Sequence, residues 1–191
     1  SEAMANQPSL AMVLTVIIEV ALARLLISFG VKPTALIGHS FGEYAAAVIA
    51  SVMDLKQAIQ MLYLRGTLAE SVSSGGMLSI QLSPEELKPH LTDDLDISLY
   101  NAPQLTVVSG PEASLTKLQE ALGEDVPTTK VKIRIAAHSS QLDPVLQSFT
   151  DSLMGLRFAD PSLDLYSTLT GDLVKPGEMS HYSYWVQQYR N

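Results

Sequence analysis

The G-x-S-x-G stretch at residues 38–42 constrains the fold of this chain more than any other segment. It follows an apolar run at residues 34–37 and precedes a helix-forming run at residues 43–50. A strand, a tight turn whose glycines avoid Cβ clashes, and a helix together form the elbow on which α/β enzymes expose a serine hydroxyl. The order of these three segments predicts that Ser40 is a nucleophile.

The same turn predicts an oxyanion site. The first amides of the new helix, including that of Phe41, would point at an oxyanion forming on a carbonyl that Ser40 attacks. The alternative interpretation of the same motif is a glycine-flanked strand-to-helix turn whose serine has no catalytic role.

Composition narrows the class of protein. With 191 residues, 47% of them hydrophobic, the chain can bury a core and fits one domain or a domain with a subdomain. A net charge of −8 without a basic run argues against nucleic-acid binding. The absence of cysteine excludes disulfides and thiolate catalysis and suits a cytoplasmic location. The four histidines lack metal-ligand spacing, so we expect no metal.

An apolar run at residues 9–29 is long enough to raise the question of a membrane span. Glu19 and Arg24 lie inside it, and the elbow strand follows directly. We interpret the run as a buried helix and expect no membrane association. No basic segment precedes it, which argues against a signal peptide.

The pattern of residues 77–135 predicts a second structural unit. Strands are expected at residues 77–82, 96–100, 105–109 and 129–135, with helices beginning at residues 83–84 and spanning 113–122. This β-α-β-β-α-β order is that of a ferredoxin-like unit. We therefore expect an α/β, hydrolase-like parallel-sheet body at residues 1–75 and 136–191. A small ferredoxin-like subdomain would occupy residues 76–135, with a cleft between the two.

A serine nucleophile needs a base, and His138 is the best candidate because it follows an apolar strand and precedes two serines. Asp143 lies nearby, but Pro144 after it makes it look like a helix cap. A backbone carbonyl can orient a histidine instead, which would leave a Ser-His dyad.

Arg65 is the other functional candidate. It lies among apolar residues on the helix expected at residues 55–72, for which Asp54 is the expected N-cap. Such an arginine either extends its charged end to water or presents its planar fork to a carboxylate. The sequence leaves these two roles open.

Several ordered motifs resemble the malonyl-CoA:acyl-carrier-protein transacylase family, in particular the acyltransferase domains of modular polyketide synthases and type I fatty acid synthases. The resemblance covers nearly the whole chain. Its motifs are Gln7-Pro8, G-H-S-F-G-E-Y-A-A-A at residues 38–47, Leu64-Arg65-Gly66, Gly76-Met77, Asn101-Ala102-Pro103, Val108-Ser109-Gly110, Ala137-His138-Ser139 and Tyr184-Trp185.

The resemblance implies a role for each matching residue. Ser40 would be the nucleophile, His138 the general base, and Arg65 the partner of the malonyl carboxylate. Gln188 falls where the family orients the histidine with a main-chain carbonyl. Asn101 would lie near the cleft, although a turn-forming role fits its local sequence equally well.

The implied activity is ping-pong acyl transfer in polyketide or fatty acid synthesis. An acyl unit would pass from CoA to Ser40. It would then pass to the phosphopantetheine thiol of an acyl carrier protein. By the resemblance, Phe41 after the serine, instead of glutamine, favours malonyl as this unit. CoA and phosphopantetheine belong to substrates and partners, so no cofactor is expected, and neighbouring synthase domains such as a ketosynthase are expected partners.

The chain departs from the family pattern in two ways. The glycine- and glutamine-containing segment that precedes the first helix is absent, as are the last strands, so the chain looks like a fragment of the full domain. The residues before His138, Ile135-Ala136-Ala137, resemble neither the tendency of malonyl-specific domains nor that of methylmalonyl-specific ones. Two alternatives stay open: an α/β-hydrolase-type esterase or thioesterase, and a non-catalytic module that docks a carrier protein.

Overall fold

A computed structural model describes residues 7–72, 75–132 and 135–191. The chain forms two compact units. The first contains the residues up to Thr67 together with Ser148–Gln188, and the second contains Leu68–Gln147 and Tyr189–Asn191. Residues 68–72, 75 and 136–147 thus fall in the second unit, which contains the four-stranded sheet, whereas the sequence pattern assigned them to the larger body. The difference arises because the helices α4 (Leu55–Val72) and α7 (Asp143–Leu153) each contribute residues to both units.

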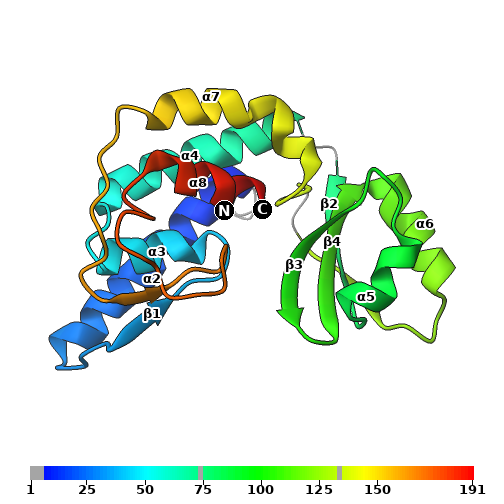
Figure 1. The fold of residues 1–191 in the computed structure, drawn as a ribbon, viewed down its shortest axis with the longest axis horizontal. Helices are drawn as coiled ribbons and strands as arrows, with labels where there is room; N and C mark the ends of the chain where they lie inside the picture. Colours follow the sequence, from blue (N-terminus) through cyan, green and yellow to red (C-terminus); the bar gives the residue numbers. More distant parts are fainter. Residues whose placement is uncertain (1–6, 73–74, 133–134) are drawn as a thin grey trace. The chain divides into compact units, whose positions relative to one another are not determined.

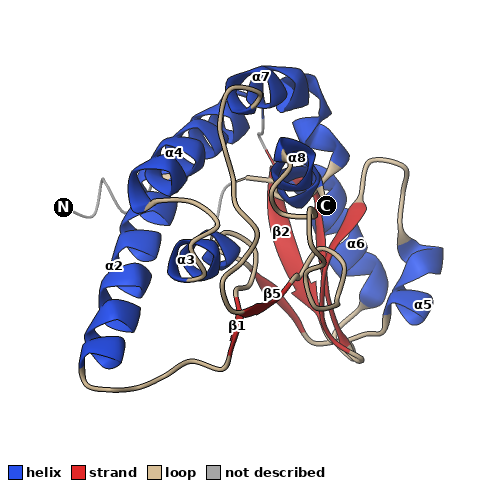
Figure 2. Cartoon of the chain, turned by 60° about the vertical axis from the view of Figure 1, so that its left-hand side comes forward, coloured by secondary structure: helices blue, strands red, loops and turns tan. Residues whose placement is uncertain are grey.

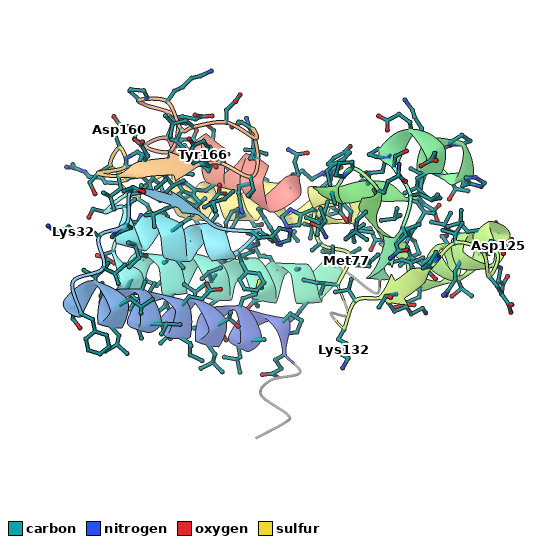
Figure 3. The ribbon with its side chains drawn as sticks, turned by 90° about the horizontal axis from the view of Figure 1, so that it is seen from below. Lys32, Met77, Asp125, Lys132, Asp160 and Tyr166 are labelled. Atoms are coloured by element: carbon teal, nitrogen blue, oxygen red, sulfur yellow. The ribbon has the colours of Figure 1, made fainter. Side chains whose placement is uncertain are left out.

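The first unit is an α/β body (Figure 1). Its two strands, β1 (Ala35–Ile37) and β6 (Asp164–Tyr166), pair in parallel with Leu36 opposite Leu165, and they run side by side in Figure 3. The helices are α2 (Pro8–Ser28), α3 (Gly42–Ile49), most of α4, part of α7, and α8 (Tyr182–Arg190) as far as Gln188. This confirms the parallel-sheet body predicted from the sequence.

The core of this unit contains a cluster of aromatic side chains around Trp185. Trp185 on α8 is fully buried, and its ring centre lies 4.9 Å from that of Tyr44, 5.3 Å from that of Tyr184 and 5.8 Å from that of Phe158. Rings at these separations pack favourably beyond the area that they bury. Trp185 therefore joins α8 to the helix that follows the elbow.

Helix α2 begins with Pro8 at its first position and ends before Gly30, whose φ of +92° places it in the left-handed region. It is not a buried helix, however. Its buried residues form one stripe, Ser9, Met12, Val16 and Val20, and large apolar side chains such as Ile18 remain exposed. By length and composition alone α2 could cross a membrane. An 18-residue stretch of this helix has a mean hydropathy of 2.4, and 22% of the stretch is buried. Its uniform apolarity does not reveal which face packs, because only the neighbouring helices decide that.

Helix α4 spans the predicted residues, and the Asp54 carboxylate caps it by accepting a 2.7 Å hydrogen bond from the Gln57 amide. The apolar spacing of this helix predicts one buried face with Leu55, Ile59, Leu62 and Leu68. Of these only Leu62 is fully buried, and the other most buried side chains are Ala58, Met61, Arg65 and Ala69. Arg65 thus lies on the packed face of α4.

The second unit is a four-stranded antiparallel sheet, with the helices α5 and α6 on one side of it (Figures 1 and 2). Its elements are β2 (Gly75–Ile80), α5 (Pro84–Leu87), η1 (Lys88–His90), β3 (Asp96–Ala102), β4 (Leu105–Pro111), α6 (Glu112–Leu122), β5 (Thr128–Lys130) and η2 (Ser140–Leu142). The strand order β3-β4-β2-β5 and the β-α-β-β-α-β sequence confirm the ferredoxin-like prediction. Leu78, Ile80 and Val108 face Leu115 and Leu118 in its core.

The last strand of this sheet is shorter than predicted. Pairing of β5 stops at Lys130, opposite Leu78, and one further bond runs from the Val131 amide to the Met77 carbonyl. Residues 133–134 of the predicted strand lie outside the described residues. Ile135 and Ala136 are buried without joining the sheet, so apolar character alone overestimated the strand.

Contact between α2 and α4 depends on Gly66. A Cβ at this position would lie 2.3 Å from the Ser9 Cα and 2.8 Å from the Ser9 nitrogen, both backbone atoms. We predict that Gly66→Ala lowers the free energy of unfolding by about 2 kcal/mol or more, because α2 must move. Urea denaturation followed by the fluorescence of Trp185, the single tryptophan, measures this. Gly155→Ala, with no atom within 4 Å of the added Cβ, is the matched control, and equal losses in both variants would contradict the prediction.

Candidate active site

The elbow predicted from the sequence is present in the first unit. Strand β1 ends at Ile37, helix α3 begins at Gly42, and Ser40 between them adopts a left-handed φ of +51°. A Cβ at Gly38 would lie 2.3 Å from the Gly42 carbonyl oxygen and 2.4 Å from the Glu43 nitrogen, so the turn can close only over glycine. At Gly42 the atoms nearest to an added Cβ would be the Glu19 carboxylate oxygens at 3.9 Å. Close backbone contact therefore requires glycine at position 38 but not at position 42.

The start of α3 supports the expected oxyanion site. The amides of Gly42, Glu43 and Tyr44 donate to the carbonyls of His39, Ser40 and Phe41. Within the described part of the chain, the Phe41 amide donates to no protein acceptor, and Phe41 is half-buried. A free amide beside a serine at a helix N-terminus is what an oxyanion requires. The assignment of Phe41 stays a prediction.

Arg65 is joined to the backbone of Ser40 through Gln188. Arg65 is 3% exposed, which excludes the role in which its charged end reaches water. Its Nη1 donates to the Gln188 Oε1 at 2.7 Å, and the Gln188 Nε2 donates to the Ser40 carbonyl at 2.7 Å. The guanidinium carbon also lies 5.8 Å from the centre of the Tyr44 ring. Ser40, Arg65 and Gln188 therefore belong to one hydrogen-bonded group.

Glu43, three residues after Ser40, is a fully buried carboxylate. Its Oε1 accepts hydrogen bonds from the Tyr184 hydroxyl at 2.8 Å and the Thr168 amide at 3.1 Å. The Tyr184 and Ser167 hydroxyls lie 2.6 Å apart, and the Thr168 hydroxyl donates to the Gly38 carbonyl at 3.3 Å. These bonds tie the first turn of α3 to α8 and to the loop after β6.

Burial raises the pKa of Glu43 to about 7, against the lowering effect of its hydrogen bonds and of the Arg65 charge. Its second oxygen, Oε2, is buried and has no hydrogen-bond partner among the described residues. Both features favour the neutral acid, because a buried carboxylate charge needs partners for both oxygens.

His138, in the second unit, is 4% exposed and has a left-handed φ of +53°. Its Nδ1 lies 2.8 Å from the main-chain oxygen of Asn191. The sequence placed the orienting main-chain oxygen at Gln188, and in the structure this oxygen belongs to a residue three positions later. The Asp143 carboxylate forms an ion pair with Arg190, at the start of α7. A backbone acceptor at Nδ1 is the arrangement of a dyad rather than a triad.

The predicted site residues are divided between the two units. Ser40, Phe41, Arg65 and Gln188 lie in the first unit, and the structure brings three of them together directly. His138 and Asn101 lie in the second unit, and their roles stay predictions. Asn101 is an exposed residue near the end of β3, two residues before the hairpin turn begins at Pro103.

Backbone strain marks the two residues predicted to perform the chemistry. Among the described residues, three that are not glycine adopt a positive φ: Ser40, Ser51 and His138. Such conformations cost about 1–3 kcal/mol each and concentrate at functional sites. Two of the three are the predicted nucleophile and base.

Sequence reasoning missed Glu43, Tyr184 and the side-chain role of Gln188. One signal was available for Glu43. It is the only charged residue between Gly42 and Ala50, the segment that forms the helix after the elbow. No comparable signal existed for the other two. Among the described residues, no group of three or more histidines and carboxylates could hold a metal ion.

The strand-turn-helix elbow, with a left-handed serine joined through Gln188 to a buried arginine, is the local arrangement that α/β enzymes with an elbow serine share. The model of the family described as "Acyl transferase domain" matches residues 4–191, and the chain belongs to this family.

Curated relatives are large synthases. The PKS-NRPS hybrid synthetase acdB of Aspergillus candidus is 38% identical over 180 residues, covering 91% of this chain and 7% of the relative. The polyketide synthase GfsB of Streptomyces halstedii is 35% identical over 176 residues, covering 89% of this chain and 3% of the relative. The chain therefore spans a small part of each relative.

Solved acyltransferase domains have the same fold. The domain from the second module of the salinomycin polyketide synthase has a TM-score of 0.92 and 33% identity, covering 100% of this chain and 46% of that one. The SpnD acyltransferase domain, solved with 2-(pent-4-yn-1-yl)malonyl, has a TM-score of 0.92 and 32% identity, with coverages of 97% and 45%. The chain spans less than half of each solved chain, which agrees with the expectation of a fragment. The full coverage also includes α2, so this apolar helix has a counterpart in an acyltransferase domain.

The raised pKa of Glu43 predicts a pH dependence of stability. Between pH 4.5 and 7 an unfolded chain loses this proton while the folded chain keeps it, so unfolding becomes easier as the pH rises. The Glu43→Gln variant has no proton to lose at this position. As the pH rises from 4.5 to 8, its free energy of unfolding should therefore increase relative to that of the wild type by up to about 3 kcal/mol. Urea denaturation at both pH values measures the difference.

The control for this prediction is Glu120→Gln, which removes an exposed carboxylate on α6. It should leave the pH dependence of the wild type unchanged. Parallel pH profiles for the wild type and Glu43→Gln would contradict the prediction.

Proposed function

We propose that this chain is part of an acyltransferase domain of a polyketide synthase that transfers a malonyl-type unit from CoA to an acyl carrier protein. The observation that carries the proposal is the elbow serine itself. Ser40 is held in a left-handed conformation, and its carbonyl is connected through Gln188 to a buried arginine. An acyl-accepting hydroxyl and a cation for a carboxylate are the two groups that a dicarboxylic thioester needs.

The first half-reaction forms an ester on Ser40. His138 would accept the hydroxyl proton, and the serine oxygen would attack the thioester carbonyl. The Phe41 amide would stabilise the oxyanion. When the intermediate collapses, the C–S bond breaks and CoA leaves as a thiol, taking the proton back from His138. The acyl group remains on the serine.

The second half-reaction reverses these steps with another thiol. The phosphopantetheine thiol of the carrier protein would give its proton to His138 and attack the ester, and Ser40 would recover its hydrogen. CoA and phosphopantetheine bring the sulfur, so the domain needs no cofactor of its own. The main-chain oxygen opposite the Nδ1 of His138 would keep the imidazole in the tautomer that this exchange requires.

Arg65 would select dicarboxylic acyl groups. A buried guanidinium pairs bidentately with a carboxylate, and an acyl group without that carboxylate would forgo this charge-assisted pair. We assign the extender unit to the malonyl type, with neighbouring domains such as a ketosynthase as partners. The proposed location is the cytoplasm, and Asn101 is assigned a place near the acyl group.

The two alternatives are less favoured. An esterase needs no arginine beneath its nucleophile, and both the family and the solved relatives are acyltransferases. A module that only docks a carrier protein has no use for a strained serine, since strain that serves no chemistry costs stability.

Ser40 should carry the acyl group. After exposure of the full-length protein to malonyl-CoA, intact-mass spectrometry should detect one malonyl adduct on the wild type and none on Ser40→Ala. Ser51→Ala removes the other serine that has a left-handed φ and should keep the adduct. A wild type without an adduct, or an adduct retained by Ser40→Ala, would refute the proposal.

Arg65 should decide which acyl group is loaded. With malonyl-CoA and acetyl-CoA in competition, Arg65→Ala should lower the ratio of malonyl to acetyl loading by about tenfold or more, because the charge-assisted pair is lost. Radiolabel incorporation measures both adducts. The exposed Arg157→Ala is the control, and an unchanged ratio in Arg65→Ala would remove the arginine from the selection of substrate.

A further inference from the structure

Helix α8 presents two polar side chains to the elbow from one face. Tyr184 and Gln188 are four residues apart, so they lie one above the other on the helix, and both are buried. Tyr184 bonds to Glu43 in the first turn of α3, and Gln188 bonds to the Ser40 carbonyl that precedes this turn. The helix thus contacts the elbow at Ser40 and again at Glu43, three residues later.

The chemistry of the partners fixes the orientation of the Gln188 amide. A guanidinium can only donate hydrogen bonds, and a main-chain carbonyl can only accept them. The amide oxygen must therefore face Arg65 and the amide nitrogen must face Ser40, as observed. The glutamine amide offers an acceptor and a donor at the same time without a charge.

The Glu43–Tyr184 bond holds the helix that carries this amide. Tyr184 is 4% exposed, and its hydroxyl lies between the Glu43 carboxylate and the Ser167 hydroxyl. Ser167 in turn accepts from the amides of Leu169 and Thr170, which fixes the loop after β6. The position of α8 against the elbow is therefore set by a buried hydrogen-bond network and by the packing of Trp185.

We propose that Gln188, seated by the Glu43–Tyr184 bond, is a positioning residue that couples Arg65 to the nucleophile elbow and thereby sets the preference for dicarboxylic acyl groups. The inference rests on the proposed function. Arg65 comes from α4 and Ser40 from the elbow, and a buried guanidinium on a long side chain has several rotamers available. The amide of Gln188 links the guanidinium to the backbone of the residue that bears the acyl ester. The distance between the cation and the ester then stays constant, so it suits one length of dicarboxylic acyl group.

The test uses the full-length protein and the competition between malonyl-CoA and acetyl-CoA. Gln188→Met keeps the length and volume of the side chain and removes both hydrogen bonds. We expect the ratio of malonyl to acetyl loading to fall by about ten- to hundredfold, the factor that corresponds to a hydrogen bond to a charged group. Gln187→Met, the adjacent exposed position on the same helix, should leave the ratio unchanged.

Two more variants separate positioning from simple loss of structure. Gln188→Glu gives Arg65 an internal carboxylate that competes with that of the substrate, so malonyl loading should fall more than acetyl loading. Tyr184→Phe removes only the hydroxyl that holds α8 to Glu43 and should shift the ratio in the same direction. Tyr182→Phe, which removes a hydroxyl from the same helix, is its control. Damage to the fold would lower both loadings together.

The outcomes distinguish the inference from the function on which it rests. A wild type that forms no adduct on Ser40 overturns both. A wild type that loads Ser40, with Gln188→Met and Gln188→Glu retaining the wild-type ratio, overturns the inference alone. An equal loss of malonyl and acetyl loading in these variants and in Tyr184→Phe also overturns it. A selective loss of malonyl loading supports it.

Discussion

The close approach of the Gly38 backbone to the first turn of α3 is the constraint on which the site depends. No side chain fits at position 38, because a Cβ there would collide with the backbone of Gly42 and Glu43. The turn is consequently tight enough to force Ser40 to a φ of +51°. That conformation lifts the serine out of the strand and leaves the Phe41 amide beside it. The positions of the proposed nucleophile and of the expected oxyanion donor both follow from this one steric constraint.

A strained turn persists only where its surroundings hold it in place. Here the Gly38 carbonyl accepts from Thr168, the Ser40 carbonyl accepts from Gln188, and Glu43 accepts from both Thr168 and Tyr184. Each bond joins the elbow to a segment more than a hundred residues later in the chain. The same contacts that stabilise the turn place Arg65, through Gln188, in a fixed relation to the serine.

Much of the fold could be predicted because its signals are local. The helix at Leu55–Val72 has a capping aspartate, and the short helix after Ser83 has a capping box. The ferredoxin-like order follows from alternating strands and their turns. Predictions failed where packing decides: α2 is apolar on every side, so its sequence could not reveal that only one stripe is buried. The last strand was overestimated because Ile135 is apolar and buried but lies outside the sheet.

The sequence by itself determined the elbow, the identity of Ser40 and the candidates His138 and Arg65, because a strand, a glycine turn and a helix are specified by neighbouring residues. Only the tertiary structure decided that Arg65 is buried, that a main-chain oxygen of Asn191 faces the imidazole, and that the Gln188 side chain bonds to both Arg65 and the Ser40 carbonyl. Gln188 lies 123 residues from Arg65 and 148 from Ser40. Hydrogen bonds over such separations leave no periodic pattern in a sequence, since they exist only once packing has brought the segments together.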